Sequence, residues 1–163
     1  MMTLNIRKRH VATTAALTAA TAVSGSIGTD PQSSWYRSLD LPDWQPPGWV
    51  FPIVWTALYG DIAVTSAAVL TELEDASRDE DADDFRRALL LNLALNQGWS
   101  WAFFTGHRLG ASVVIAALLA ASSVDLARRA GQAGRGAGVA LVPYAAWCCF
   151  ATVLTEAIRR RNR

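Results

Sequence analysis

Hydrophobic and polar positions separate sharply along this chain. Four long stretches contain no Arg, Lys, Asp or Glu, and a fifth contains Asp61 alone: residues 11–29, 88–107, 109–124, 136–155 and, with Asp61, 44–71. A helix crosses the hydrocarbon core of a bilayer with about 20 mainly apolar residues, and with about 17 at the shortest. The pattern therefore predicts five transmembrane helices, at residues 10–29, 48–71, 87–106, 109–127 and 136–158.

These segments predict an all-α integral membrane protein, a multi-pass bundle of five transmembrane helices in a single domain, residues 1–163. Helices are favoured over barrel strands because the apolar stretches do not alternate and because backbone polar groups in lipid must be paired within the segment. Lys and Arg are more numerous on the side of the membrane that holds the N-terminus than on the other side, which favours a cytoplasmic N-terminus. We expect the membrane to be a prokaryotic cell membrane. The first segment is threonine-rich and follows Arg7, Lys8 and Arg9, so a cleaved signal peptide is the alternative to a retained helix.

Three connections between the predicted helices have distinctive compositions. Residues 30–47 contain Pro42, Pro46 and Pro47, which restrict the backbone, so this loop is predicted to be an ordered lid. Leu73–Phe85 is strongly acidic and is predicted to be a solvated loop without a hydrophobic face. Gly131–Gly138 is predicted to be a flexible connector. These connections leave no room for a separate soluble domain.

Composition excludes several classes of function. The formal net charge is +1, whereas nucleic-acid binding requires a basic face. Cys148 and Cys149 are adjacent in an apolar run, and His10 and His107 are far apart in sequence with no Cys, His, Asp or Glu cluster around either. We therefore expect no nucleic-acid partner, no disulfide framework and no metal site.

The third predicted helix carries the clearest chemical pattern. Asn92, Asn96, Trp99 and Phe103 recur at helical spacing, which places two amides and two aromatic rings on one stripe. Amides inside a membrane helix point into the bundle. The stripe then serves either hydrogen bonds between helices or a cavity for a flat, largely apolar molecule with polar edges.

Two tryptophans lie too deep to belong to an aromatic belt at the membrane interface. With a rise of about 1.5 Å per residue, Trp55, Asn96 and Trp147 lie roughly 10, 15 and 17 Å from one membrane face. The loop at residues 30–47 lies at the same face. Tryptophan rings at this depth suit stacking on a conjugated ligand.

Asp61 is the only acidic residue inside the second predicted helix. An ionised carboxylate facing lipid costs several kcal/mol. We therefore expect Asp61 to face a neighbouring helix or a dimer partner, with Asn92 or Asn96 as a plausible hydrogen-bond partner. A shorter helix that leaves Asp61 near trapped water is the alternative.

Three motifs occur in order between Trp35 and about Ile158 and resemble those of the TspO/MBR family, the tryptophan-rich sensory proteins and mitochondrial translocator proteins. The first reads WYRSLDLPDWQPPGWVFPIVWTALY, the second LALNQGWSWAFF and the third PYAAWCCFATVL. Their matching positions are Trp35, Tyr36, Leu39, Pro42, Trp44, Pro46, Pro47, Trp49, Val50, Phe51, Trp55, Thr56, Leu58 and Tyr59; Leu93, Leu95, Asn96, Trp99, Phe103 and Phe104; and Pro143, Tyr144, Trp147, Phe150, Ala151 and Leu154.

The resemblance implies five membrane helices, a homodimer, and a pocket for porphyrins closed by the loop after the first helix. It implies that the pocket contains Tyr36, Trp44, Trp49, Trp55, Asn96, Trp99 and Trp147. The stripe adds Asn92 and Phe103 to the expected ligand-binding residues, and Gln97, where the family often has tryptophan, is an amide that could reach the same cavity. The sequence also departs from the family at Leu41, Ile62, Ala63 and Thr155, and it lacks the sterol-recognition pattern.

The resemblance leaves three functions open. The first is binding of a tetrapyrrole such as protoporphyrin IX or haem, for sensing or transport, with no obligatory cofactor. The second is an enzyme that degrades protoporphyrin IX with light and oxygen, in which Trp55 and Trp147 would be the catalytic pair. The third is a membrane scaffold that modulates partner proteins. We favour binding, because the expected pocket offers aromatic faces and neutral hydrogen-bonding groups but no acid/base pair or activated nucleophile.

Overall fold

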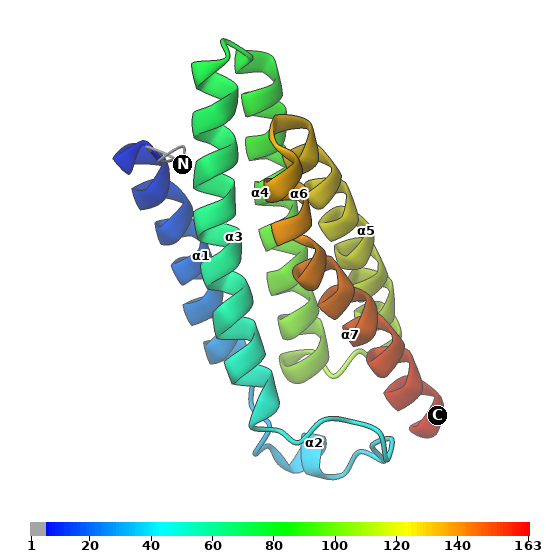
Figure 1. Ribbon diagram of the computed structural model, residues 1–163. Helices are drawn as coiled ribbons and strands as arrows, with labels where there is room; N and C mark the ends of the chain where they lie inside the picture. Colours follow the sequence, from blue (N-terminus) through cyan, green and yellow to red (C-terminus); the bar gives the residue numbers. More distant parts are fainter. Residues whose placement is uncertain (1–5) are drawn as a thin grey trace.

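The computed structural model describes residues 6–163, so residues 1–5 of the expected domain lie outside the described part. Long helices account for most of the chain (Figure 1): α1 (Lys8–Gly28), α3 (Val50–Asp75), α4 (Asp79–Ser100) continued by the π-helical turn η1 (Trp101–Thr105), α5 (Leu109–Ala133) and α7 (Val142–Arg161). Two short helices, α2 (Ser34–Arg37) and α6 (Arg135–Ala140), lie in the connections. The prediction of an all-helical, five-helix bundle is confirmed.

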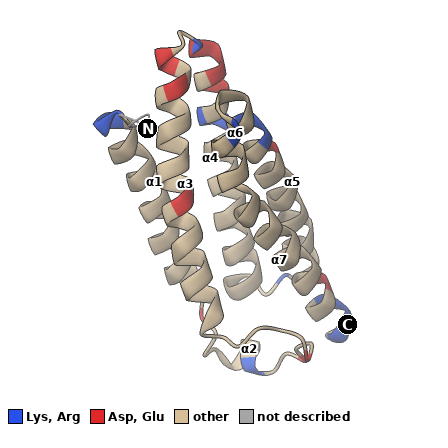
Figure 2. Ribbon diagram, viewed as in Figure 1, with Lys and Arg blue, Asp and Glu red and all other residues tan. Residues whose placement is uncertain are grey.

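Apolar and charged residues are placed as a bilayer requires. Charged residues gather at the ends of the helices and in the connections between them, apart from Asp61 in the middle of α3 (Figure 2). Large apolar side chains such as Val64, Val114, Leu118 and Val153 lie on the outside of the bundle, where lipid rather than water is the favourable neighbour. Among residues 6–163, four helical segments are long and apolar enough to cross a membrane, namely α1, α3, α5 and the α6–α7 segment. The chain is therefore a multi-pass membrane protein.

The acidic connection differs from its prediction. Leu73–Phe85 is not a solvated loop: α3 continues to Asp75 and α4 begins at Asp79, so that only a three-residue turn remains. Leu73 and Phe85 are buried in the core. The segment therefore has a hydrophobic face, which its strongly acidic composition did not indicate. Acidic residues in the first turn of α4 are also favourable beside the partial positive charge of a helix N-terminus.

The glycine-rich connection also differs from its prediction. Gly131–Gly138 is almost entirely helical, because only Gly134 separates α5 from α6. A Cβ atom on Gly138 would lie 2.7 Å from the Cα atom of Gly131. The glycines thus serve close approach of two helices rather than flexibility.

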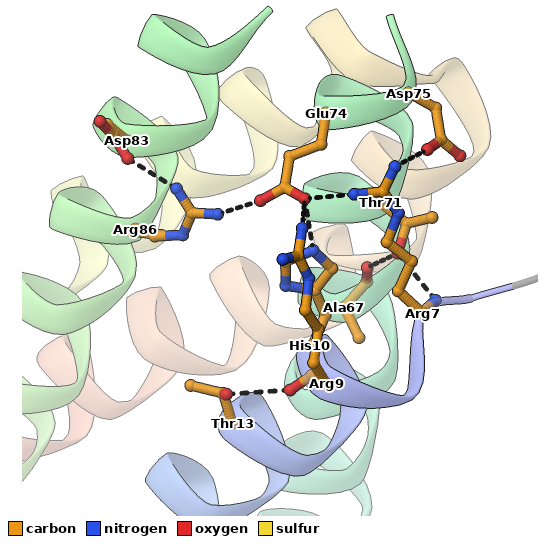
Figure 3. Close-up of polar contacts among 10 residues, drawn as sticks. All are labelled: Arg7, Arg9, His10, Thr13, Ala67, Thr71, Glu74, Asp75, Asp83 and Arg86. Carbon is orange, nitrogen blue, oxygen red and sulfur yellow. Dashed lines mark hydrogen bonds and ion pairs between the residues drawn. The ribbon is translucent and has the colours of Figure 1, made fainter. Parts of the chain in front are cut away.

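Helix α1 is fixed at its N-terminal end by a cluster around Glu74 (Figure 3). The Glu74 carboxylate of α3 accepts hydrogen bonds from Arg7, Arg9 and Arg86 and contacts His10 Nε2 at 3.0 Å. Only 12% of the Glu74 side chain is exposed. Because Arg86 belongs to α4, this single carboxylate joins three helices.

Asp61 is half-buried, and its expected pairing with an amide of α4 is wrong. Its Oδ1 atom accepts a hydrogen bond from Thr65 Oγ1 at 2.9 Å, one turn further along α3. The two amides have tyrosine partners instead: Tyr59 donates to Asn96 Oδ1, and Tyr144 donates to Asn92 Oδ1, each at 2.7 Å. Tyrosine reaches them because its long side chain spans the distance between packed helices, whereas the hydrogen bond of the shorter Asp61 side chain stays within α3.

Candidate ligand-binding site

A cavity of ≈ 390 Å³ lies in the half of the bundle nearest the loop between α1 and α3. Its wall is formed by α1, this loop, α3, α4 with η1, and α7. The lining residues are Ala22, Gly25, Ser26, Thr29, Pro31, Tyr36, Gln45, Gly48, Phe51, Pro52, Trp55, Tyr59, Asn96, Trp99, Ser100, Phe103, Phe104, Leu154, Thr155 and Ile158. Among these described residues none is charged, and the volume lies within the range of small-molecule sites, about 300–1,000 Å³.

Aromatic rings from different helices meet at Trp55. The ring centroids of Trp55 and Trp99 are 6.3 Å apart, and those of Trp55 and Tyr59 are 5.7 Å apart. Trp147 of α7 meets Trp55 edge-on at 6.4 Å, with its ring plane at 84° to that of Trp55. Trp55 and Trp99 line the cavity and Trp147 supports Trp55 from behind. The arrangement places two neighbouring indole rings, Trp55 and Trp99, on the cavity wall.

The wall has few polar side chains, and most of them form hydrogen bonds with other uncharged side chains. Trp99 Nε1 donates to Thr155 Oγ1 at 3.2 Å, which fixes the plane of the indole. Tyr59 donates to Asn96 Oδ1, which leaves the Asn96 Nδ2 atom buried and without a partner. Gln45 donates to the Tyr36 hydroxyl at 3.1 Å, while its Oε1 atom is buried and without a partner. Within the described residues these two lining side chains each keep one polar atom without a hydrogen-bond partner.

The π-helical turn η1 sets which side chains of this helix face the cavity. It follows directly on α4 and widens the last turn, as single π-helical turns often do at functional sites. Phe103 is buried in the wall, whereas Trp101 is 39% exposed and packs against Gly28 of α1. The two rings therefore lie on opposite sides of one turn.

The loop between α1 and α3 is hydrogen-bonded to the C-terminal end of the chain. The Asp40 backbone N–H donates to Asn162 Oδ1 at 2.9 Å, and Asn162 Nδ2 donates to the Asp40 carbonyl at 3.0 Å. Trp35 stacks on His107 with ring centroids 4.2 Å apart. These contacts hold the loop across the end of the bundle, at the bottom of Figure 1.

The structure brings five of the ten expected ligand-binding residues together on the wall: Tyr36, Trp55, Asn96, Trp99 and Phe103. The other five do not line the cavity. Trp44 is 50% exposed and packs on Phe150, and Trp49 is 68% exposed at the start of α3. Asn92 lies deeper, bonded to Tyr144, while Gln97 donates to the Thr21 carbonyl of α1 and Trp147 lies behind Trp55.

Several wall residues escaped the sequence interpretation. Tyr59 and Phe104 are both in the quoted motifs, so their motif positions are the signal that could have included them. Thr155 and Gln45 are isolated polar residues without a pattern. Ala22, Gly25 and Ser26 of α1 are small residues that carry no chemical signature, and only the packing of α1 brings them to the wall.

Within residues 6–163, no group of three or more His, Cys, Asp or Glu side chains is close enough to hold a metal ion. Comparison with known proteins agrees with the helical membrane bundle. The model of the TspO/MBR family matches residues 12–161. The chain belongs to the TspO/MBR family.

Curated relatives extend over most of the chain. The chain is 35% identical over 128 residues to the uncharacterized membrane protein YtaB of Bacillus subtilis, covering 78% of this chain and 80% of that protein. It is 31% identical over 144 residues to the tryptophan-rich protein TspO of Chlorobaculum tepidum, covering 88% and 89%. The human translocator protein is 32% identical over 128 residues, covering 78% of this chain and 75% of that protein. TspO/MBR membership therefore applies to nearly the whole bundle.

Proposed function

We propose that this TspO/MBR protein binds a tetrapyrrole, of the protoporphyrin IX or haem type, in the aromatic cavity and thereby serves porphyrin sensing or transport. The observation that carries the proposal is the pair of tryptophan faces, Trp55 and Trp99, on one uncharged cavity wall. Such faces stack on a planar conjugated ring. The free Asn96 Nδ2 donor and the free Gln45 Oε1 acceptor suit the polar edges of such a molecule.

The uncharged wall also constrains the orientation of the ligand. A carboxylate without a cationic partner is strongly disfavoured in an apolar cavity. The propionate groups of a porphyrin would therefore remain at the loop end, near the water, and the apolar edge would point toward Asn96. Arginines at that end of the bundle include Arg37, Arg108 and Arg161, which favours the same orientation.

The test is a titration of purified protein in nanodiscs with protoporphyrin IX, followed by quenching of tryptophan fluorescence. We expect saturable quenching with one porphyrin per chain. Absence of saturable quenching with both protoporphyrin IX and haem would reject tetrapyrrole binding and favour the scaffold function.

A second function, light- and oxygen-dependent degradation of protoporphyrin IX, is favoured by the direct contact of Trp55 with Trp147. Such contact would let an oxidised Trp55 be reduced by Trp147. Illumination of the protein–porphyrin complex in air separates the two functions. A new absorbing product that is lost in Trp147→Phe supports the enzyme, whereas an unchanged porphyrin spectrum supports binding alone.

We also propose that the protein forms a homodimer through the outward side of α3. Thr56, Ala57 and Gly60 are exposed on this helix, and small residues allow close approach of membrane helices. The Asp61 Oδ2 atom beside them is buried yet lacks a hydrogen-bond partner within the described part of one chain.

A further inference from the structure

The cavity is closed on one side of the bundle and open on the other. Its lining residues on α7 are all buried, and those on α4 with η1 are buried or half-buried. The exposed lining residues lie elsewhere: they are Ser26 of α1, Pro31 and Gly48 of the loop, and Pro52 in the first turn of α3. These four residues form what we call the lateral mouth.

The lateral mouth faces lipid. Ile27, next to Ser26, is 73% exposed, and Ile53, next to Pro52, is 62% exposed. Bare isoleucines on both sides of an opening indicate hydrocarbon rather than water around it. The water side is instead covered by the loop, which the hydrogen bonds between Asp40 and Asn162 hold in place.

The hydrogen bonds of α1 explain why the opening lies between α1 and α3. Thr14 Oγ1 donates to the Ala63 carbonyl of α3 at 2.8 Å, and among the described residues no hydrogen bond joins these two helices nearer the mouth. The C-terminal half of α1, nearest the mouth, is hydrogen-bonded instead to α4 and η1. Gln97 of α4 donates to the Thr21 carbonyl, and Thr105 of η1 donates to the Gly28 carbonyl at 3.1 Å.

The wall on the α1 side of the mouth consists of small side chains. Ala22, Gly25 and Ser26 follow one another at helical spacing, and the Ser26 hydroxyl bonds only to its own helix, at the Ala22 carbonyl. Opposite them, a Cβ atom on Gly48 would meet nothing within 4 Å. The opening therefore has room at its rim, and among the residues that the structure describes no side-chain hydrogen bond crosses the rim from Ser26.

We propose that the cavity is loaded sideways from the membrane through the lateral mouth, and that it takes flat ligands which are dissolved in the bilayer and enter with an uncharged edge first. This inference rests on the proposed function, since it names how that ligand reaches its site. It selects against fully water-soluble ligands, because the loop covers the direct path from water.

The experiment measures association and dissociation rates of protoporphyrin IX by stopped-flow tryptophan quenching, with the protein in nanodiscs. In Ser26→Trp a bulky ring closes the mouth, and we expect both rates to fall about tenfold or more, since a narrowed path slows passage in both directions. Damage to the site itself would instead speed dissociation. The matched control is Val114→Trp, which adds a ring of the same size on the lipid side of α5, a helix that contributes none of the lining residues, and leaves both rates unchanged.

Two further variants keep the test decisive. Gly48→Phe closes the mouth from the other side and replaces Ser26→Trp if that variant fails to fold. Asn162→Ala releases the loop, and we expect no acceleration of either rate. Unchanged rates in both mouth variants, or faster rates in Asn162→Ala, would overturn lateral entry and place the path beneath the loop.

Pyrene, a flat fluorophore without carboxylates, separates failure of this inference from failure of the proposed function. Energy transfer from tryptophan to pyrene reports its entry. If protoporphyrin IX does not bind but pyrene does, tetrapyrrole binding is rejected, and the mouth is judged from the pyrene rates. If neither probe enters the unmodified protein, both proposals are rejected.

Discussion

At the scale of single residues, the tryptophans divide by what surrounds each ring rather than by depth alone. Trp55 and Trp99 line the cavity, Trp147 supports Trp55, and Trp101 covers Gly28 on the opposite side of the π-helical turn. Trp99 is further fixed by its hydrogen bond to Thr155. A rigid ring on the wall loses little freedom when it stacks on a ligand.

Replacing Trp99 with alanine should weaken binding of protoporphyrin IX by about 1–3 kcal/mol, the range for loss of one aromatic stacking surface. Trp101→Ala is the matched control, because it removes the same ring two residues away without touching the cavity. Both are measured by fluorescence titration in nanodiscs. Equal losses in the two variants would remove the case for a directional wall.

The sequence predicts those residues of the cavity wall that share one helix, but not those that tertiary packing brings from other helices. Asn96, Trp99 and Phe103 share one helix, so their spacing alone places them together. Tyr59 and Thr155 come from other helices and meet that stripe only through tertiary packing, which no local pattern encodes. Gln97 lies next to the stripe in sequence but turns toward α1, because consecutive residues lie about 100° apart around a helix.

At the scale of elements, hydropathy predicted where helices exist but not where they end. The charges of Leu73–Phe85 hid a helical hairpin, because the buried positions Leu73, Ala82 and Phe85 are too few to outweigh its acidic residues in an average. The acidic residues at its start also explain why α4 is not among the helices that are apolar enough to span a membrane. Its place in the bundle follows from packing against α5 and α1.

Helix α1 depends on polar contacts to an unusual degree. Its buried side is made of His10, Thr14, Thr18, Thr21 and two glycines, and lipid gives apolar helices no hydrophobic drive to associate. Contacts such as those of Glu74 at its N-terminal end therefore carry much of its attachment to the bundle.

Glu74→Ala should lower the free energy of unfolding by about 1–3 kcal/mol, because it leaves the buried His10 and the surrounding arginine groups without their shared acceptor. Asp83→Ala is the control, since Asp83 pairs only with Arg86 at the exposed surface, where a pair contributes about 0–1 kcal/mol. Thermal unfolding in detergent measures both. A Glu74 variant as stable as the Asp83 variant would show that the cluster does not hold α1.

The loop between α1 and α3 is predicted to act as an ordered lid whose stability comes from few contacts. Asn162→Ala removes both hydrogen bonds to Asp40, each of which contributes about 0.5–1.5 kcal/mol. Amide hydrogen exchange of residues 38–47 should then quicken by roughly tenfold, because exchange follows the free energy of local opening. Arg160→Ala, which loses only a pair with Glu156, should leave it unchanged. Bound porphyrin should slow exchange in the unmodified loop, and rapid exchange unaffected by porphyrin would exclude a lid.

At the scale of the whole molecule, the two ends of the bundle have different tasks. The acidic hairpin end contains the Glu74 cluster and fixes the helices to one another. The opposite end contains the cavity, the loop and the lateral mouth. A bundle held firmly at one end can open at the other with little loss of packing, which suits a site that a large flat molecule must enter.

The outward side of α3 leads to the last prediction, which concerns Asp61. A carboxylate in the middle of a membrane helix is costly, by about 2.5–3.5 kcal/mol on insertion scales, and Thr65 occupies only one of its oxygens. If the exposed side of α3 beside Asp61 packs against a second copy, Asp61→Leu changes the polarity and shape of that contact and should lower the dimer fraction. Asp61→Asn retains size and hydrogen bonding and should preserve it.

Dimer fraction is measured by energy transfer between labelled copies in vesicles, with Val153→Leu, an exposed change on α7, as the control. In a lipid-facing position without a partner, leucine would relieve the cost of the carboxylate and raise monomer stability with no change in dimer fraction. That outcome would contradict a dimer through α3. A fall in dimer fraction confined to Asp61→Leu would place the carboxylate at the contact between two copies.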